Sequence, residues 1–504
     1  MLRKWHEIDC NAIDDIEIAD GRRYSRTGLL DQSIKNTKSQ ETVMRKSLLT
    51  VALACAFPVA YAQSSVTLYG IVDVGIENLD VGSVSATRLQ SGMSAGSRWG
   101  IRGSEDLSPG WRALFTLESR IEVDTGSVTN NGALYWCRAN SAAATAPTVC
   151  PGVAFVTTPP AVQVPAAAQP TIVGGLNAVN NSLLQAITTV NAVGALFDRQ
   201  AWGGLVTPVG GFFLGRQYTP GYEILNKYNA IGDQTALQFG QGFSNPAIRA
   251  NNSLQYRIEL RGFTASLMYG FGGSETQRNE RATAPQNGDD FMGGNLQYNA
   301  ANWGVGVGYN RNNVVPFNTG TSPSKRTGLE MFNAGGFVGF GPVRLYAQYL
   351  KRENENPILQ PADIQNIVVS TGGSLAAITS ILGGLQINSF DMDTMRGLAG
   401  PTDSEAYHAG VSWRFGNSTL YGIYNYGKDD GRSAWATADA KANHYGVAYF
   451  YDFSRRTQLY AAAAFVDNSG QSRVSPSAAG YATGFTTAAG EDARSLQLGM
   501  RHSF

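Results

Sequence analysis

What is scarce in this sequence excludes several classes of protein. Beyond residue 62, no uninterrupted apolar run reaches the roughly 18 to 20 residues that a membrane-spanning helix needs. Charged residues make up 15% of the chain, against about 25% in ordinary soluble domains. Basic and acidic residues balance at 39 each, so the composition offers no basic surface for a nucleic acid. Neither a helical membrane protein nor a nucleic-acid-binding protein is expected.

The main apolar run is short and lies near the start of the chain. Residues 44–46 form a basic segment, residues 48–59 are apolar, and Ala60-Tyr61-Ala62 fits the small-x-small rule for cleavage. This pattern predicts a signal peptide over residues 44–62 and a mature chain over residues 63–504. Residues 1–43 precede a signal that normally stands at the N-terminus. We interpret them as a non-native extension from an upstream start codon; the alternative is a genuine long leader that is also removed.

Cysteine and histidine are too rare to build a metal centre. Cys10 and Cys55 precede the mature chain, which leaves Cys137 and Cys150 with twelve residues between them. Two thiols alone make a poor metal site, whereas the oxidising compartment behind an export signal favours a disulfide. The three histidines of the mature chain lack the spacing of metal ligands. We therefore expect a disulfide between Cys137 and Cys150, no metal site and no cofactor.

From residue 64 to the end, apolar and polar residues alternate in short stretches separated by glycine, asparagine and proline. In Ser65–Glu77, for example, Val66, Leu68 and Val72 share one parity, while Thr67 and Asp73 share the other. A period of two indicates β-strands. We count sixteen such segments, which start near residues 64, 96, 111, 197, 211, 250, 262, 290, 303, 328, 343, 405, 418, 442, 456 and 493.

The lengths of the connections alternate as well. Tight turns such as 208–211 and 341–342 alternate with long connectors such as 124–195 and 353–404. This arrangement is typical of outer-membrane barrels, with short turns on one rim and long loops on the other. The sequence therefore predicts an all-β fold, a 16-stranded antiparallel transmembrane β-barrel with short periplasmic turns and long extracellular loops. Aromatic residues near the expected strand ends predict an interfacial girdle: Tyr69, Trp99, Trp111, Trp202, Trp303, Tyr346, Trp413, Tyr421 and Tyr451.

Several segments resemble a known family. They are Ser64–Asp73 at the mature start, Ser97–Leu107, Phe197–Leu205 with Leu214–Tyr218, and the ending Leu498–Phe504. These segments are similar to the general trimeric porins of the Gram-negative outer membrane, most closely to those of β-proteobacteria. The resemblance covers both ends and the first third of the barrel. It implies a channel for ions and small hydrophilic solutes, a homotrimer, and contact with outer-membrane lipid and lipopolysaccharide.

The resemblance also implies a constriction inside the pore. In the family the third long loop, here residues 218–246, folds into the lumen and presents acidic groups to a ladder of arginines on the barrel wall. Transferred by motif, the constriction residues are Arg98, Arg216, Arg249, Glu223 and Asp233. Alternation supports Arg98, which shares parity with Arg102, and Arg249, which shares parity with Ser253 and Arg257. Arg216 shares parity with the apolar Phe212 and Leu214, and so lacks this support.

Opposed charges in a narrow wet channel orient solutes and change the local potential that an ion meets. The further charges that parity assigns to the lumen are Arg102, Arg112, Glu118, Arg120 and Arg257. Because the arginines outnumber the assigned acids, we expect a weak preference for anions. The alternative is that about half of these arginines pair with carboxylates and serve only as structural bridges.

Two other classes of function are compatible with parts of the sequence. Gly92-Met93-Ser94-Ala95-Gly96 matches the nucleophile elbow of hydrolases, and a barrel of the outer membrane can be an esterase or lipase. An elbow needs a strand before the serine and a helix after it, whereas Ser94 precedes an expected strand. The long loops would also suit a surface adhesin. We favour a pore over both, and expect no enzymatic activity.

Overall fold

The computed structural model describes residues 65–82, 85–126, 196–232, 235–239, 248–271, 290–314, 327–354, 402–429, 440–470 and 490–504, together with residues 472, 474–476 and 486. The predicted signal peptide, the upstream extension, the disulfide between Cys137 and Cys150, and Asp233 lie outside the described residues. They stay predictions.

The described chain is almost entirely β-strand. The strands are β1 (Ser65–Asp80), β2 (Ser85–Ser91), β3 (Arg98–Ser108), β4 (Trp111–Arg120), β5 (Gln200–Thr207), β6 (Gly210–Tyr218), β7 (Arg249–Leu260), β8 (Phe263–Gly270), β9 (Phe291–Asn299), β10 (Trp303–Val314), β11 (Thr327–Phe340), β12 (Val343–Asn354), β13 (Thr402–Phe415), β14 (Ser418–Asp429), β15 (Ala440–Asp452), β16 (Thr457–Gly470) and β17 (Ala493–Ser503). Helix α4 (Pro220–Lys227) and the 3₁₀ turn η1 (Thr235–Leu237) lie between β6 and β7. No helix among the described residues is long and apolar enough to cross a membrane.

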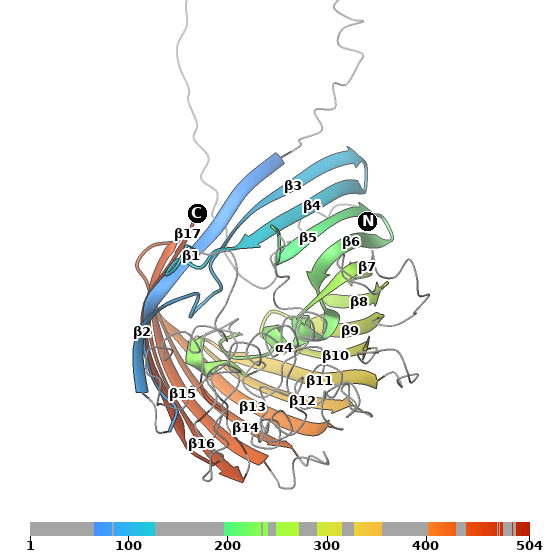
Figure 1. Cartoon of the computed structure of the whole chain (residues 1–504). Helices are drawn as coiled ribbons and strands as arrows, with labels where there is room; N and C mark the ends of the chain where they lie inside the picture. Colours follow the sequence, from blue (N-terminus) through green and yellow to red (C-terminus); the bar gives the residue numbers. More distant parts are fainter. Residues whose placement is uncertain are drawn as a thin grey trace, which may run out of the picture.

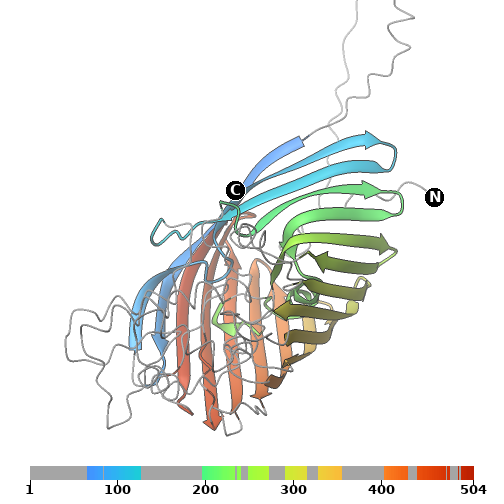
Figure 2. The same cartoon turned by 45° about the vertical axis from the view of Figure 1, so that its right-hand side comes forward.

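All strands belong to one antiparallel sheet that closes on itself. β1 pairs with both β2 and β3, each strand from β3 onward pairs with the next, and β17 pairs with β1 over ten residue pairs from Ile71↔Ser503 to Asp80↔Arg494. Figures 1 and 2 show the resulting ring of tilted strands. β2 and β3 lie one after the other along the same side of β1, so the 17 strands occupy sixteen positions around the ring. The predicted 16-stranded antiparallel barrel is confirmed.

The second position around the ring is interrupted, which the sequence did not predict. β2 was not among the expected segments, because its only large apolar residue is Leu89. Residues 92–97 separate it from β3 and turn inward, where Met93 is fully buried. The Asp73 carboxylate of β1 holds this inward bend by accepting hydrogen bonds from the backbone N–H groups of Ser94 (3.1 Å) and Ala95 (2.8 Å).

The two faces of the sheet have opposite character, as the period of two predicts. Outward-facing Leu68, Leu267 and Leu498 are more than 60% exposed. Inward-facing Asn333 and Asn425, by contrast, are fully buried. A soluble protein has the reverse distribution. An apolar outside and a polar inside, with backbone hydrogen bonds closed around the ring, are what a lipid bilayer requires of a β-barrel.

The connections divide between the two rims. Those from β3 to β4, β5 to β6, β7 to β8, β9 to β10, β11 to β12, β13 to β14 and β15 to β16 are two to four residues long. Glycine allows the tightest of them, because Gly341 and Gly416 adopt φ of +59° and +58°. Because the strands alternate in direction, all these turns lie on one rim, here called the short-turn rim. β3 continues to Ser108, so its turn to β4 consists of Pro109 and Gly110 alone.

The aromatic girdle was only partly predicted correctly. Trp99, Trp111, Trp303, Trp413 and Tyr451 lie on the outer face, as their register against outward apolar residues shows. Tyr69, Trp202, Tyr346 and Tyr421 instead point inward. Tyr69 donates a hydrogen bond to the inward Glu118, and Tyr346 packs against the same interior cluster as Leu237 of η1. Position near a strand end does not decide the face; the parity within the strand does.

Residues 219–232 and 235–239, the described residues of the expected inward loop, cross the interior of the barrel (Figure 1). Thr219 caps α4 and Pro220 occupies its first turn. Inward amides then hold the helix: Asn310 of β10 accepts from the Gly221 N–H at 3.0 Å, and Asn333 of β11 donates to the Gly221 carbonyl at 2.8 Å. A side chain at Gly221 would collide with Asn310, which explains why glycine occupies this position.

The loop then continues to the far side of the ring. The Ala230 N–H donates to His408 of β13 at 3.1 Å, and the Ala236 N–H donates to Gln497 of β17 at 2.9 Å. The Thr235 N–H donates to the Met93 carbonyl at 2.6 Å. Contacts therefore run from β10 to β17, and the loop narrows the lumen at this level.

Candidate functional site

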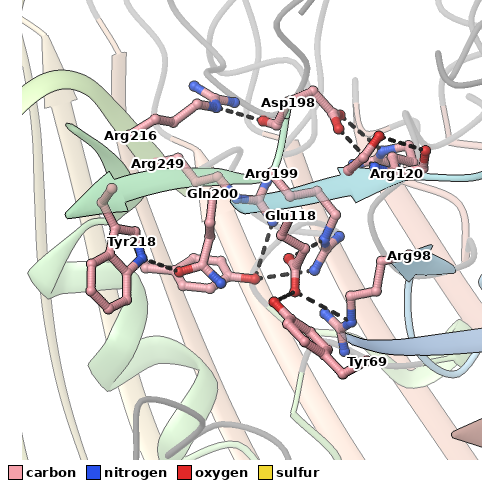
Figure 3. Close-up of polar contacts among 12 residues, drawn as sticks. Tyr69, Arg98, Glu118, Arg120, Asp198, Arg199, Gln200, Arg216, Tyr218 and Arg249 are labelled. Atoms are coloured by element: carbon pink, nitrogen blue, oxygen red, sulfur yellow. Dashed lines mark hydrogen bonds and ion pairs between the residues drawn. The ribbon is translucent and has the colours of Figure 1, made fainter. Parts of the chain in front are cut away.

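Charged side chains converge on the inner wall formed by β3 to β7, and Figure 3 shows most of them. All are less than a tenth exposed. Five are arginines and three are acids: Arg98, Arg120, Arg199, Arg216 and Arg249, with Glu118, Glu122 and Asp198. We call this set the arginine cluster.

Glu118 of β4 is the centre of the cluster. Its carboxylate accepts from Arg199 Nε at 2.7 Å and from the Tyr69 hydroxyl at 3.0 Å, and Arg98 Nε lies 3.9 Å away. Arg98 and Arg120 face each other across the β3–β4 pair, an arrangement of like charges that is unfavourable by itself. The carboxylates around them offset this repulsion, so the site is built on ion pairs within the wall.

Tyr218, the last residue of β6, connects the cluster with the loop. Its hydroxyl oxygen accepts hydrogen bonds from Arg199 and from Arg249, each at 3.1 Å. The Arg249 guanidinium lies 4.7 Å from the centre of the Tyr218 ring, a cation–π contact. The same ring stacks on Tyr222 of α4, with centroids 5.4 Å apart. The position of the helix and the position of the guanidinium groups therefore depend on one aromatic side chain.

Asp198 organises the second half of the cluster. Its carboxylate accepts from the Arg120 backbone N–H at 2.9 Å and lies 3.4 Å from Arg120 Nε, while Glu122 lies 3.7 Å from the same guanidinium. The Asp198 backbone carbonyl accepts a hydrogen bond from Arg216, which also donates to Asn251. Burial by itself lowers the pKa of Arg199 beside this group, but Tyr218 and Glu118 outweigh it and hold that pKa well above the usual value. Arg199 therefore carries its charge at every pH of interest.

An irregularity in β6 explains how Arg216 reaches the cluster. Phe212 and Leu214, which share its parity, are 39% and 58% exposed on the outer face, whereas Arg216 is 7% exposed. The register against β7 shifts between Gly215 and Gln217. Gly215 has φ of +131°, and a Cβ there would lie 2.2 Å from the Ala201 carbonyl oxygen. The shift turns Arg216 away from the face that simple alternation assigns to it.

The same irregularity undermines the parity argument for Arg249. Gly215 faces Ser253 but Gln217 faces Ala250, and Asn252 between them has φ of +48°. Because of this shift, the alternation that places Ser253 and Arg257 on the inner face does not extend to Arg249. It is 3% exposed and lies in the arginine cluster nevertheless, through its contacts with Tyr218.

Glu223 of α4 is held by the wall rather than standing alone in the lumen. Its carboxylate accepts from Arg257 at 3.0 Å and from Asn295 at 2.9 Å. Arg257 also binds Glu259 at 2.8 Å, so one guanidinium lies between two carboxylates. Burial and the neighbouring Arg257 lower the pKa of Lys227 at the end of the same helix. Because Arg257 already pairs with Glu223, the described part of the loop presents less negative charge to the arginine cluster than the resemblance implies.

The two remaining predicted charges lie on the inward face of the same wall. Arg102 is paired in register with Thr116 of β4, and its guanidinium lies 5.1 Å from the centre of the Tyr69 ring. Arg112 shares the parity of Thr116 and Glu118 and lies next to the short-turn rim. Both add positive charge to this side of the lumen.

The sequence analysis missed four residues of the site, for two different reasons. Asp198 and Arg199 stand just before β5, where no alternation exists from which a face could be predicted. Tyr69 and Tyr218 lie in strands, but their role depends on hydroxyl contacts with Glu118, Arg199 and Arg249. A run of two opposite charges next to an aromatic residue, Phe197-Asp198-Arg199, was the available signal.

The residues of the elbow-like motif at Ser94 do not form a nucleophile elbow. Ser94 lies in the inward bend between β2 and β3, with no helix after it. Its buried hydroxyl makes no hydrogen bond within the described chain, and so no base contacts it there. Among the described residues no group of three potential metal ligands occurs.

The comparison with protein families decides the nature of this barrel. The model of the family described as Gram-negative porin matches residues 49–471. The chain belongs to this family of Gram-negative porins. It is accordingly an outer-membrane channel for the passive diffusion of ions and small hydrophilic solutes, and not an enzyme. Neither a barrel hydrolase nor an adhesin is favoured.

Individual relatives agree with the family. The porin is 26% identical to outer membrane porin protein 32 of Delftia acidovorans, over 92% of this chain and all of that protein. A solved structure described as an anion-selective porin from Comamonas acidovorans matches with a TM-score of 0.57 at 21% identity, over 88% of this chain and all of that one. OmpT, described as an outer membrane protein of Vibrio cholerae in a trimer form, matches with a TM-score of 0.51 at 14% identity, over 88% of this chain and 99% of that one.

Proposed function

We propose that this porin conducts anions in preference to cations, weakly, through the passage between the arginine cluster and the inward loop. One observation carries the proposal: in the arginine cluster, five guanidinium groups lie among three carboxylates. The similar porin from Comamonas acidovorans is described as anion-selective, which supports the same preference here. In this proposal the short-turn rim faces the periplasm and the other rim meets lipopolysaccharide.

The physical basis is the potential inside a narrow opening. A fixed charge acts more strongly on an ion when protein replaces part of the surrounding water, because the effective dielectric constant falls. Unbalanced guanidinium groups thus raise the local concentration of anions and lower that of cations. The ion pairs of Glu118 with Arg199 and of Glu223 with Arg257 cancel part of the field. These ion pairs make the expected preference for anions weak. The alternative in which some arginines serve only as structural bridges is therefore partly included in the proposal.

The reversal potential of single channels tests the preference. The measurement uses planar bilayers with a tenfold gradient of potassium chloride. We expect a reversal potential whose sign shows that chloride is more permeant than potassium. The preference should fall as the salt concentration rises, since salt screens the wall charges. A potential of the opposite sign at low salt contradicts the proposal.

We further propose that the porin assembles as a homotrimer through the outer faces of β3 to β5. Small side chains of β4 and β5, Ala113, Ala201 and Gly203, share this outer face and allow close contact between walls. The neighbouring Gly204 faces inward, towards Phe213, since a Cβ at that position would lie 2.3 Å from the Phe213 ring. The trimer form of Vibrio cholerae OmpT supports this assembly.

Chemical cross-linking of the purified porin tests the trimer. The wild type should yield a three-fold species. Gly203→Trp should reduce it strongly, whereas Ala461→Trp on the outer face of β16 should leave it intact. A wild type that cross-links only as a monomer would rule the assembly out.

A further inference from the structure

Five aromatic side chains line the inner wall on the side of the ring that lies across from the arginine cluster. Each comes from a different strand among β11 to β16: Phe337, Tyr346, Tyr421, Phe450 and Tyr460. Neighbouring ring centroids lie 6.1 Å apart for Phe337 and Tyr346, and 5.4 Å apart for Tyr421 and Phe450 and for Phe450 and Tyr460. We call this set the aromatic row.

The row has a constant height in the barrel. Every member lies two or three residues from the end of its strand at the short-turn rim. At about 3.3 Å per strand residue, the rings stand roughly 7–10 Å inside that mouth. Tyr228 of the loop reaches the same level: its ring stacks on Phe337 with centroids 6.3 Å apart, and its hydroxyl donates to Asn299 and Val305 near the short-turn rim.

The loop covers the members of the row to different degrees. Phe450 and Tyr460 are 4% exposed and pack against Met93 and Leu237. Phe337 contacts Tyr228 of the loop, and Tyr346 and Tyr421 pack against the cluster around Leu237, but these three rings are only half-buried and point into the lumen. Between Tyr346 and Tyr421, β13 contributes Gly410 and Ser412, and so no large side chain separates the two rings. An aromatic surface that faces water has a cost, which a ligand with a flat apolar face would remove.

Three arginines surround this surface, one step nearer the mouth. The Arg344 guanidinium lies 4.4 Å from the centre of the Phe337 ring. Arg414 and Arg501 also face inward at the ends of β13 and β17. Arg414 lies 3.6 Å from Asp452. Neither Arg344 nor Arg501 forms an ion pair within the described chain.

The other acid near the row is Asp73, paired in register with Arg501. Its carboxylate already accepts hydrogen bonds from Tyr460 at 2.6 Å and from the backbone of Ser94 and Ala95. Three guanidinium groups thus stand near two carboxylates, Asp73 and Asp452, and a net positive charge remains next to the half-buried rings.

We propose that the exposed part of the aromatic row, with Arg344, Arg414 and Arg501, binds flat organic anions, that is, aromatic carboxylates, at the short-turn mouth. The ring of the solute stacks on Tyr346 and Tyr421, and its carboxylate meets a guanidinium group. This site is separate from the arginine cluster, which lies on the opposite wall beyond the loop. The proposed site adds a class of solute to the proposed anion preference. It rests on that preference only for the passage of the solute through the rest of the pore.

Benzoate and cyclohexanecarboxylate distinguish this site from a general attraction of anions. The two carry the same charge and are similar in size, but only benzoate is flat and aromatic. Each is added to one side of a planar bilayer that holds single wild-type channels, and the flickering block of the chloride current is recorded. We expect benzoate to block at a concentration roughly five- to tenfold below that of cyclohexanecarboxylate, the ratio that one stacking contact supplies. The block should be stronger from the short-turn mouth.

Two kinds of variant locate the block. Tyr346→Leu and Tyr421→Leu should each remove most of the difference between the two solutes, and Arg344→Gln should weaken the block by both. Tyr349→Leu is the matched control, because Tyr349 lies on the same strand but faces outward, towards Tyr407. It should leave the block unchanged.

The outcomes separate this site from the proposed function. Equal block of the wild-type channel by benzoate and cyclohexanecarboxylate overturns the aromatic site, even if the reversal potential confirms the anion preference. Preferential benzoate block that survives both tyrosine substitutions also overturns it. A cation preference in potassium chloride together with tyrosine-dependent benzoate block would leave the site standing and remove the anion preference.

Discussion

Arg98→Glu and Arg249→Glu will move the reversal potential of the channel toward that of potassium. Each substitution reverses a charge in the arginine cluster, where both guanidinium groups are less than a tenth exposed and bulk water screens them poorly. We expect each to lower the ratio of chloride to potassium permeability by roughly two- to fivefold. The measurement is the zero-current potential of single channels in a potassium chloride gradient, at low and at high salt.

The control for this experiment makes the same change of charge on the other face of the wall. Lys441 of β15 is paired in register with Lys428 and faces outward. Lys441→Glu should leave the reversal potential within error of the wild type. If both cluster variants conduct but keep the wild-type potential, their side chains do not determine the selectivity.

Glu118→Gln will destabilise the barrel more than any other single removal of a charge from the wall. Its carboxylate binds Arg199 at 2.7 Å and Tyr69 at 3.0 Å, with Arg98 nearby, and it is 3% exposed. Removing one partner of a buried ion pair leaves uncompensated charge and costs about 3–5 kcal/mol. Here the remaining charges are guanidinium groups that also repel each other. Equilibrium unfolding in urea, followed by β-sheet circular dichroism, measures the loss.

A surface ion pair of the same length provides the comparison. Glu330 lies 2.7 Å from Arg311 on the outer face, but both side chains are about one third exposed. Glu330→Gln should therefore cost only about 0–1 kcal/mol. Equal losses for Glu118→Gln and Glu330→Gln would show that burial does not strengthen the interaction, and the account of the cluster as mutually dependent ion pairs would be wrong.

The fold was largely predictable because alternation is a local property. Each strand from β3 to β17 corresponds to an expected segment, and the alternation in Trp111–Arg120 predicts the inward face that the β3–β4 register shows. The interruption at residues 92–97 was missed, because it depends on Asp73, a residue of another strand. Local patterns carry no information about such partners.

The candidate site was less predictable for a related reason. Alternation assigned Arg98 to the lumen correctly, yet it left Arg216 on the outer face, because no pattern marks the register shift at Gly215. The family resemblance implied that Glu223 of the loop faces the arginine ladder, but only the structure shows that Arg257 of β7 binds it. Two members of the aromatic row, Tyr346 and Tyr421, were assigned to the expected girdle, since an aromatic residue near a strand end has the same sequence signature on either face.

The sequence by itself determined that this chain is a barrel that is apolar outside and polar inside, because a period of two repeats along every strand and needs no knowledge of distant residues. Family resemblance added the channel. Only the tertiary structure decided which charges meet. Arg199, Glu118, Tyr69 and Tyr218 come from four separate parts of the chain, and closure of the ring brings them within hydrogen-bonding distance. The field inside a pore depends on those distances, and distances between remote residues exist only once the sheet has closed.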